Sequence, residues 1–263
     1  MIDTQEIQDE IRGAISAEQA AIDALKKHSG PVIAVINQST VVSDDDVRDT
    51  TAALQIQLSR DFVPAWGLDG TLVFYKKGEQ IPAGAWQLVV LDNSPQADAL
   101  GFHDLTSDGL PIGKVFAKTD LDSGSSWTVT ASHELLEMRA DPDICRCVLI
   151  DSGRLYALEV GDAPEDDQFG YQIDGVLVSD FVYPSWFESF WKPGQVQFDY
   201  GKHINAPFEI LTGGYIGYMD IRSSTGWQQL THQSVPNKKA RAPIGSRRER
   251  RRTPKNQWQR STI

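Results

Sequence analysis

Residues 127–143 read WTVTASHELLEMRADPD, and this stretch decides the fold class that we expect. Val129, Leu136 and Ala140 lie roughly on one face of a helix, because apolar residues at these spacings share a side. The Asp-Pro pair at 141–142 ends the helix, since proline disfavours helical backbone in the residue before it. We therefore predict an amphipathic helix over this stretch.

The polar residues of this helix indicate its chemistry. His133 and Glu137 are four residues apart and project from the same side of the helix, with Glu134 beside them. In HExxH zinc helices two ligands at this spacing hold the ion, and the intervening glutamate is the general base. Here Glu137 replaces the second histidine, which suits harder cations such as manganese or calcium better than three imidazoles would. A lone HExxE also occurs by chance, in which case these side chains would lie on a solvated helix face with Arg139.

Helices and strands alternate before this stretch. Residues 4–28 have the pattern of an amphipathic helix, and Ser43 is a typical N-cap for a second helix that ends near Phe62. Residues 120–126 form a polar lead-in to the HExxE helix. The predicted strands are residues 31–37 (PVIAVIN), 71–75 (TLVFY), 86–91 (WQLVVL), 99–104 (ALGFHD) and 113–117 (GKVFA). Beyond Pro142 two strands of a hairpin are predicted at 145–150 and 154–160, and further strands or loops at 176–182, 196–200 and 209–219. This order predicts an α/β or α+β domain.

The order of elements resembles that of the zincin metallopeptidases, in which an edge strand that pairs with substrate precedes the metal-binding helix. The resemblance covers roughly residues 30–145. It implies an α+β fold: a zincin-like mixed sheet with two or three helices, followed by a β-rich C-terminal part. The chain also resembles an uncharacterised family of phage and bacterial proteins with HExxE followed by Asp-Pro. Two later segments of that family match residues 159–162 (EVGD) and 179–187 (SDFVYPSWF).

The third metal ligand has two candidates under this resemblance. A pattern like that of snapalysin places it at Asp143, ten residues after His133, with Ala140 where a turn glycine would stand. A gluzincin-like pattern takes it from a later element, where Glu159 is the leading candidate with Asp162 beside it. Glu159 ranks ahead because an acid inside the apolar stretch LYALEV needs a partner in order to be buried.

The resemblance implies a peptidase that uses zinc or another divalent cation. The cation would polarise the scissile carbonyl and lower the pKa of a bound water, and Glu134 would take the proton of that water. The strand at 99–104 would align an extended peptide substrate. His103 or Tyr183 would stabilise the oxyanion.

Charge is distributed unevenly along the chain. The net charge is −11, but residues 237–263 contain ten Lys or Arg and one acid, Glu249. This segment therefore carries about +9, which leaves about −20 for the rest of the chain.

We divide the chain into an N-terminal helix (1–29), a zincin-like core with the metal helix (30–145), a β-rich part of the same domain (146–235) and a basic, extended tail (236–263). The tail could bind nucleic acid or tether the chain to neighbouring subunits of an assembly such as a virion.

Two functions from different classes fit these features. The first is a zincin-like metal-binding protein that cleaves peptides with Glu134 as base. The alternative is a structural or adhesion component of a phage particle, with a degenerate metallopeptidase fold and a basic tail that tethers it. The N-terminus lacks the features of a secretory signal, and no apolar run is long enough to cross a membrane. A cytoplasmic or virion-associated protein is therefore expected.

Overall fold

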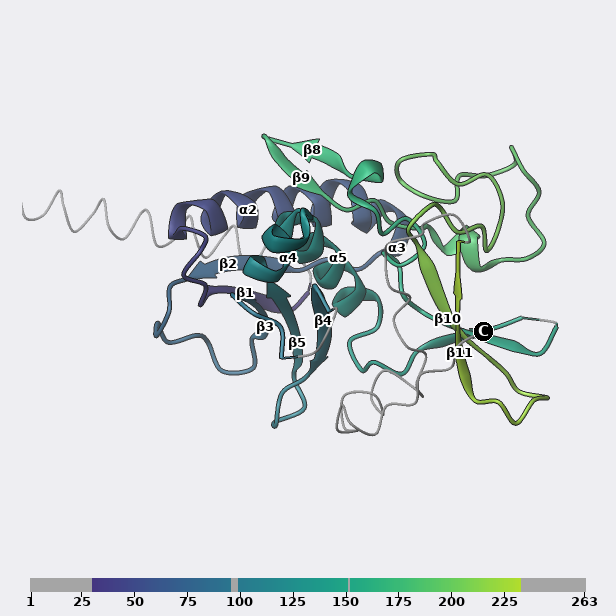
Figure 1. Ribbon diagram of the computed structural model, residues 1–263, viewed down its shortest axis with the longest axis horizontal. Coiled ribbons are helices and arrows are strands. Elements are labelled where there is room, and N and C mark those ends of the chain that lie inside the picture. Colours follow the sequence, from purple (N-terminus) through teal and green to yellow (C-terminus); the bar gives the residue numbers. More distant parts are fainter. Residues whose placement is uncertain (1–29, 96–98, 151, 233–263) are drawn as a thin grey trace, which may run out of the picture.

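A five-stranded sheet forms the centre of the molecule (Figure 1). The computed structural model describes residues 30–95, 99–150 and 152–232, so the expected helix at 4–28 and the basic tail at 236–263 lie outside the described residues. The strands are β1 (Val32–Asn37), β2 (Thr71–Tyr75), β3 (Trp86–Leu91), β4 (Gly101–Leu105) and β5 (Pro111–Phe116), in the spatial order β2-β1-β3-β5-β4. Four of them are parallel, and β4 runs antiparallel to β5 at one edge of the sheet. The site is built next to this edge.

The apolar run of β1 is buried on both faces of the sheet. Ile33 and Val35 point into the main core under the helices, whereas Ala34 and Ile36 belong to a smaller cluster on the other face. The main core also takes Leu88 and other apolar residues from the neighbouring strands. The sheet is therefore a rigid support for the helices above it.

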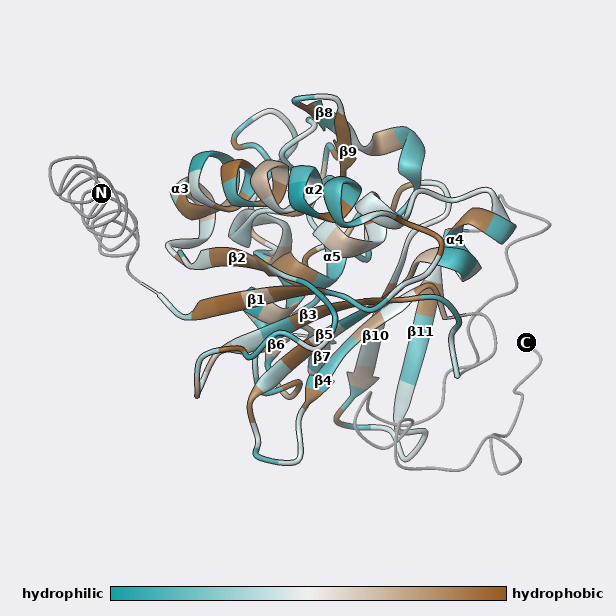
Figure 2. Ribbon diagram, turned by 90° about the vertical axis from the view of Figure 1, so that its left-hand side faces the viewer, coloured by the Kyte–Doolittle hydropathy of each residue, from teal (hydrophilic) through white to brown (hydrophobic). Residues whose placement is uncertain are grey.

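Within the described residues four α-helices and one π-helix accompany the sheet, and Figure 2 shows α2 and α5 on the same side of it. The elements are α2 (Asp44–Ile56), the π-helix η1 (Gln57–Phe62), α3 (Val63–Trp66), α4 (Ala117–Ser123) and α5 (Trp127–Ala140). The expected single helix from Ser43 to Phe62 begins as predicted, with Ser43 in a capping box with Asp46. Its last part is a π-helix instead, and α3 continues the helical path to Gly67, whose φ of 68° is left-handed.

The prediction of a polar lead-in at 120–126 was wrong in its first part, because α4 covers residues up to Ser123. α4 ends at Ser123 because the next residue, Gly124, has left-handed backbone with a φ of 78°. The HExxE helix itself is α5, and it ends at Ala140 with Asp141 as its C-cap. Its predicted end before the Asp-Pro pair is confirmed.

The C-terminal part is rich in short strands, which confirms the α+β class. β6 (Cys147–Leu149), β7 (Arg154–Ala157), β10 (Tyr215–Asp220) and β11 (Trp227–Thr231) form an antiparallel sheet, and β8 (Tyr171–Ile173) pairs with β9 (Val176–Val178). Two 3₁₀ turns lie at Asp167–Phe169 (η2) and Pro184–Phe187 (η3). The segment 196–200, predicted as a strand or loop, contributes only an isolated bridge between Val182 and Asp199. The strand predicted at 154–160 ends at Ala157, so Glu159 lies in the segment that follows β7 and not within a strand.

Among the described helices, none has the length and apolar character that a membrane crossing requires.

Candidate metal centre

The polar residues of α5 face the interior of the protein. His133 is 5 % exposed, Glu134 4 % and Glu137 0 %. Arg139 is also buried, with its guanidinium 4.8 Å from the centre of the Trp86 ring, and burial lowers its pKa to about 10. The alternative of a solvated helix face is therefore wrong. Charged groups in such a place need partners, because burying an unpaired charge is costly.

A buried network of hydrogen bonds holds α5 just before His133. The Ser132 hydroxyl donates to Gln57 Oε1 over 2.6 Å and accepts from the Ser179 amide over 3.0 Å. Gln57 Nε2 donates in turn to the Ser179 carbonyl over 2.8 Å. Three distant segments, η1, α5 and the chain after β9, thus meet at one point. Because Ser132 precedes His133, this network fixes where the His133 ring lies.

One oxygen of Glu137 lies in a first group of side chains. His133 Nε2 is 3.2 Å from Glu137 Oε1 and 3.4 Å from Asp162 Oδ1. The Gly161 amide donates to the same Glu137 oxygen over 3.3 Å. Candidate ligand atoms of His133, Glu137 and Asp162 all lie within 4.8 Å of one another. We call these three residues the His133 group.

The other oxygen of Glu137 lies in a second group. His103, which β4 supplies, places its Nδ1 3.6 Å from Glu137 Oε2 and 3.5 Å from Glu134 Oε2. Its Nε2 is 3.9 Å from Glu159 Oε2. Candidate ligand atoms of His103, Glu137 and Glu159 again lie within 4.8 Å of one another. We call these three residues the His103 group.

Two glycines leave the space that the side chains of His133 and Glu134 occupy. A Cβ on Gly161 would lie 2.6 Å from His133 Nδ1, and a Cβ on Gly101 would lie 2.8 Å from Glu134 Oε1. Any other residue at these positions would displace a functional side chain. The segment after β7 and the edge strand β4 can therefore approach α5 closely only because each has a glycine, Gly161 or Gly101, at the contact.

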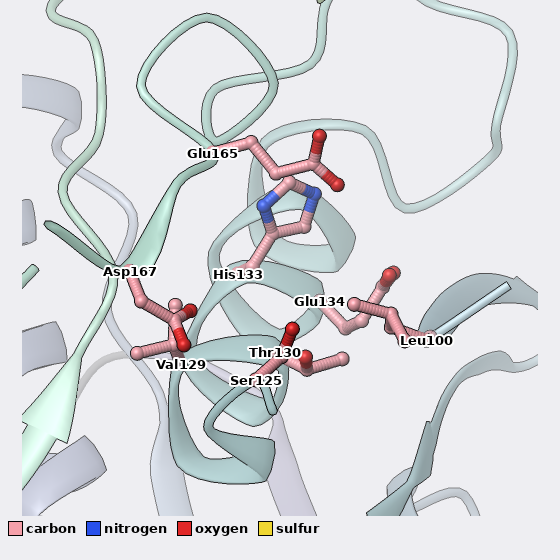
Figure 3. Close-up of a pocket in the computed structure, with 9 residues that line it drawn as sticks. Leu100, Ser125, Val129, Thr130, His133, Glu134, Glu165 and Asp167 are labelled. Atoms are coloured by element: carbon pink, nitrogen blue, oxygen red, sulfur yellow. The ribbon is translucent and has the colours of Figure 1, made fainter. Parts of the chain in front are cut away.

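A pocket opens over the N-terminal half of α5 (Figure 3). Its lining comprises Leu100, Gly101, Ser125, Val129, Thr130, His133, Glu134, Glu165 and Asp167. In Figure 3 the Glu165 side chain extends from its loop toward the His133 ring. Asp167 accepts a hydrogen bond from the Ser126 amide over 2.7 Å, at the N-cap of α5. His133 and Glu134 are thus buried but reachable from this side.

The electrostatic surroundings raise the pKa of His133. Burial by itself lowers this pKa, but the charge of Glu137 and the hydrogen bond to Asp162 outweigh it and raise the pKa well above its usual value. This direction favours the protonated imidazole when no cation is bound. A metal ion that binds His133 must displace that proton, as ligand binding by histidine generally requires.

The sequence-predicted site residues separate into two sets. His133, Glu134, Glu137, Glu159 and His103 lie together around α5. The other two are not among the residues that line the pocket. Asp143 is exposed beyond the end of α5. Tyr183 accepts a 3.4 Å hydrogen bond from Gln197.

Sequence reasoning ranked Glu159 above Asp162 and did not place Glu165 and Asp167 in the pocket that they line. The short spacing from Glu159 to Asp162 was the available signal, because two acids so close in sequence can reach different parts of one site. Which of them approaches His133 depends on the path of the chain after β7. In the structure Asp162 makes that contact.

Another buried acidic pair, Asp180 and Asp199, forms with His203 a third group whose candidate ligand atoms lie within 4.8 Å of one another. Asp180 accepts hydrogen bonds from the Phe181 and Gly201 amides, and Asp199 accepts from the His203 and Ile204 amides. Burial and the neighbouring Asp199 raise the pKa of Asp180 to about 9. These bonds close the turn at residues 199–204 against the segment after β9.

The donor set around α5 fits a divalent cation. It offers imidazole nitrogens and carboxylate oxygens, which suit zinc, and its excess of carboxylates also suits harder ions such as manganese. One buried oxygen, Glu134 Oε2, has no hydrogen-bond partner within the described residues. Such an atom is costly unless something outside the chain satisfies it.

The sequence matches no protein-family model, and comparisons with curated proteins and with solved structures returned no match.

Proposed function

We propose that this chain is a zincin-like metal-binding protein that hydrolyses peptide bonds, with Glu134 as the general base. The observation that carries the proposal is the convergence of two histidines and four carboxylates, all buried, next to a pocket that His133 and Glu134 line. A bound divalent cation supplies a Lewis acid that polarises a carbonyl and lowers the pKa of water. The chain contributes the ligands, the base and the substrate surface.

The His133 group would hold the ion. Its three side chains come from α5 and from the segment after β7, and their candidate ligand atoms lie within 4.8 Å of one another. Asp162 is the third ligand in this proposal, ahead of Glu159 and Asp143, because it is the acid that reaches His133. A site with one nitrogen and two carboxylate ligands binds zinc and accepts manganese as well.

Glu134 has the position that a general base needs. It follows His133 on α5, lines the pocket and is 4 % exposed. Its carboxylate can accept the proton of a water that the ion of the His133 group polarises.

The edge strand β4 would align the substrate. It is the last strand of the central sheet as described, and Gly101 on β4 also lines the pocket. An extended peptide can pair with an exposed sheet edge through main-chain hydrogen bonds. Pairing along β4 would bring a scissile bond near Glu134, because Gly101 packs against that side chain.

The test uses the full-length protein with zinc and a library of unstructured peptides. We expect cleavage by the wild type, loss of cleavage in Glu134→Gln and retention of the bound zinc in that variant. Asp162→Asn should lose zinc, whereas the matched control Asp143→Asn should keep both zinc and activity. Equal cleavage by Glu134→Gln and wild type would refute the base assignment. Bound zinc without any cleavage would refute the peptidase and favour the structural phage component.

A further inference from the structure

Glu137 connects the two groups of ligands through different oxygens. Its Oε1 lies 3.2 Å from His133 Nε2, and its Oε2 lies 3.6 Å from His103 Nδ1. The carboxylate is 0 % exposed, so neither oxygen is turned to solvent. A carboxylate with one oxygen in each of two ligand groups has the geometry of a bridge between two cations.

Each group has enough donors for an ion of its own. Besides the shared Glu137, the His133 group has Asp162, and the His103 group has Glu159. In sites with two cations the ions are typically about 3.5–4 Å apart, which a shared carboxylate can span. The two groups together therefore offer more ligand atoms than one cation needs.

The buried oxygen of Glu134 points to a cation in the His103 group. Glu134 Oε2 has no hydrogen-bond partner within the described residues and lies 3.5 Å from His103 Nδ1. A cation held by His103 and Glu159 would give this oxygen a neighbour of opposite charge. Glu134 could then remain the base of the proposed reaction while its position is fixed by that ion.

The charges of the centre lead to the same conclusion. Glu134, Glu137, Glu159 and Asp162 are all at most 4 % exposed. One divalent cation carries two positive charges against these four carboxylates, whereas two cations, both ligated by neutral histidines, carry four. A second divalent cation balances the carboxylates, and buried charge without compensation is strongly unfavourable.

We propose that the centre holds two divalent cations bridged by Glu137, one in the His133 group and the other in the His103 group. The proposal rests on the proposed function, because the first ion is the one that the peptidase requires. It also changes the role of two residues: His103 and Glu159 become ligands of the second ion, and His103 is then not an oxyanion donor.

The experiment counts the ions bound to each chain. Full-length protein is stripped with chelator and reloaded with Zn²⁺ alone, and native mass spectrometry measures the stoichiometry. We expect two ions in the wild type and one in both His103→Ala and Glu159→Gln. Glu159→Gln keeps the shape of the side chain, so it tests the site even if His103→Ala does not fold. Asp143→Asn is the control and should keep two ions.

A second measurement uses Mn²⁺ and electron paramagnetic resonance. Two ions that share Glu137 should give the spectrum of a magnetically coupled pair, and Glu159→Gln should give that of an isolated ion. One ion in the wild type that Glu159→Gln leaves in place would overturn the second site while the proposed function stands. No ion in the wild type would overturn both.

Discussion

The substitution Gln57→Leu tests how the centre is positioned. Gln57 is fully buried and joins Ser132 on α5 to the Ser179 carbonyl after β9. Leucine has a similar size but removes these two hydrogen bonds and a third, 3.2 Å bond from Gln57 to the Tyr171 hydroxyl. The Ser132 hydroxyl then loses its acceptor and the Ser179 carbonyl loses its donor. Each buried group left without its partner costs about 1–3 kcal/mol. We therefore expect the free energy of unfolding to fall by about 2–4 kcal/mol, after the apolar packing of leucine is taken into account.

Urea unfolding of the ion-free protein, followed by tryptophan fluorescence, measures this change. The matched control is Gln80→Leu, because Gln80 is exposed, and its free energy of unfolding should change by less than about 0.5 kcal/mol. The Gln57 variant should also bind zinc more weakly, since Ser132 precedes His133. A loss below about 0.5 kcal/mol for Gln57→Leu, with unchanged zinc affinity, would refute the claim that this network holds α5 in place.

Three further outcomes are expected. Asp180 keeps its proton up to about pH 9 in the folded chain but loses it near pH 4 when unfolded, so its stabilising contribution falls as pH rises between these values. In Asp180→Asn this pH dependence of stability should disappear. Denaturation midpoints of the variant and the wild type, measured at pH 5 and pH 9, test this expectation. Parallel pH profiles of the two proteins would contradict it. Gly101→Ala should displace Glu134 and lower peptide cleavage about 100-fold with bound zinc retained, as cleavage rates and metal content can show. Ser43→Ala should cost about 1 kcal/mol of stability in urea through loss of the α2 capping box, and no change would contradict that role.

The features that local geometry dictates could be predicted from the sequence. His133 and Glu137 lie on one side of α5 because residues four apart in any helix do so. The Asp-Pro pair ends the helix for a steric reason that depends on no distant residue. The strand β1 was predicted from its run of β-branched residues, and its alternating burial follows from the geometry of a strand.

The features that depend on distant contacts could not be predicted in the same way. The apolar letters of LYALEV favoured a strand through Val160, but β7 ends at Ala157, and the chain then brings Asp162 to His133 and Glu159 to His103. The choice between the two acids depends on the fold around them and not on their spacing.

The π-helix is a second example. Its residues continue the apolar pattern of α2, so the pattern alone predicts a regular helix to Phe62. The partners of Gln57 are 75, 114 and 122 residues further along the chain, at Ser132, Tyr171 and Ser179. Only the assembled fold shows why a polar residue is buried at this position.

Anomalous diffraction at the zinc absorption edge tests most directly whether the buried groups around α5 hold a cation. Crystals of the full chain grown with zinc should give an anomalous peak in contact with His133 Nε2, Glu137 and Asp162. Crystals of His133→Ala, grown in the same way, should lose that peak. A wild-type structure without anomalous density at this centre, with His133 still paired directly to Glu137, would contradict the account.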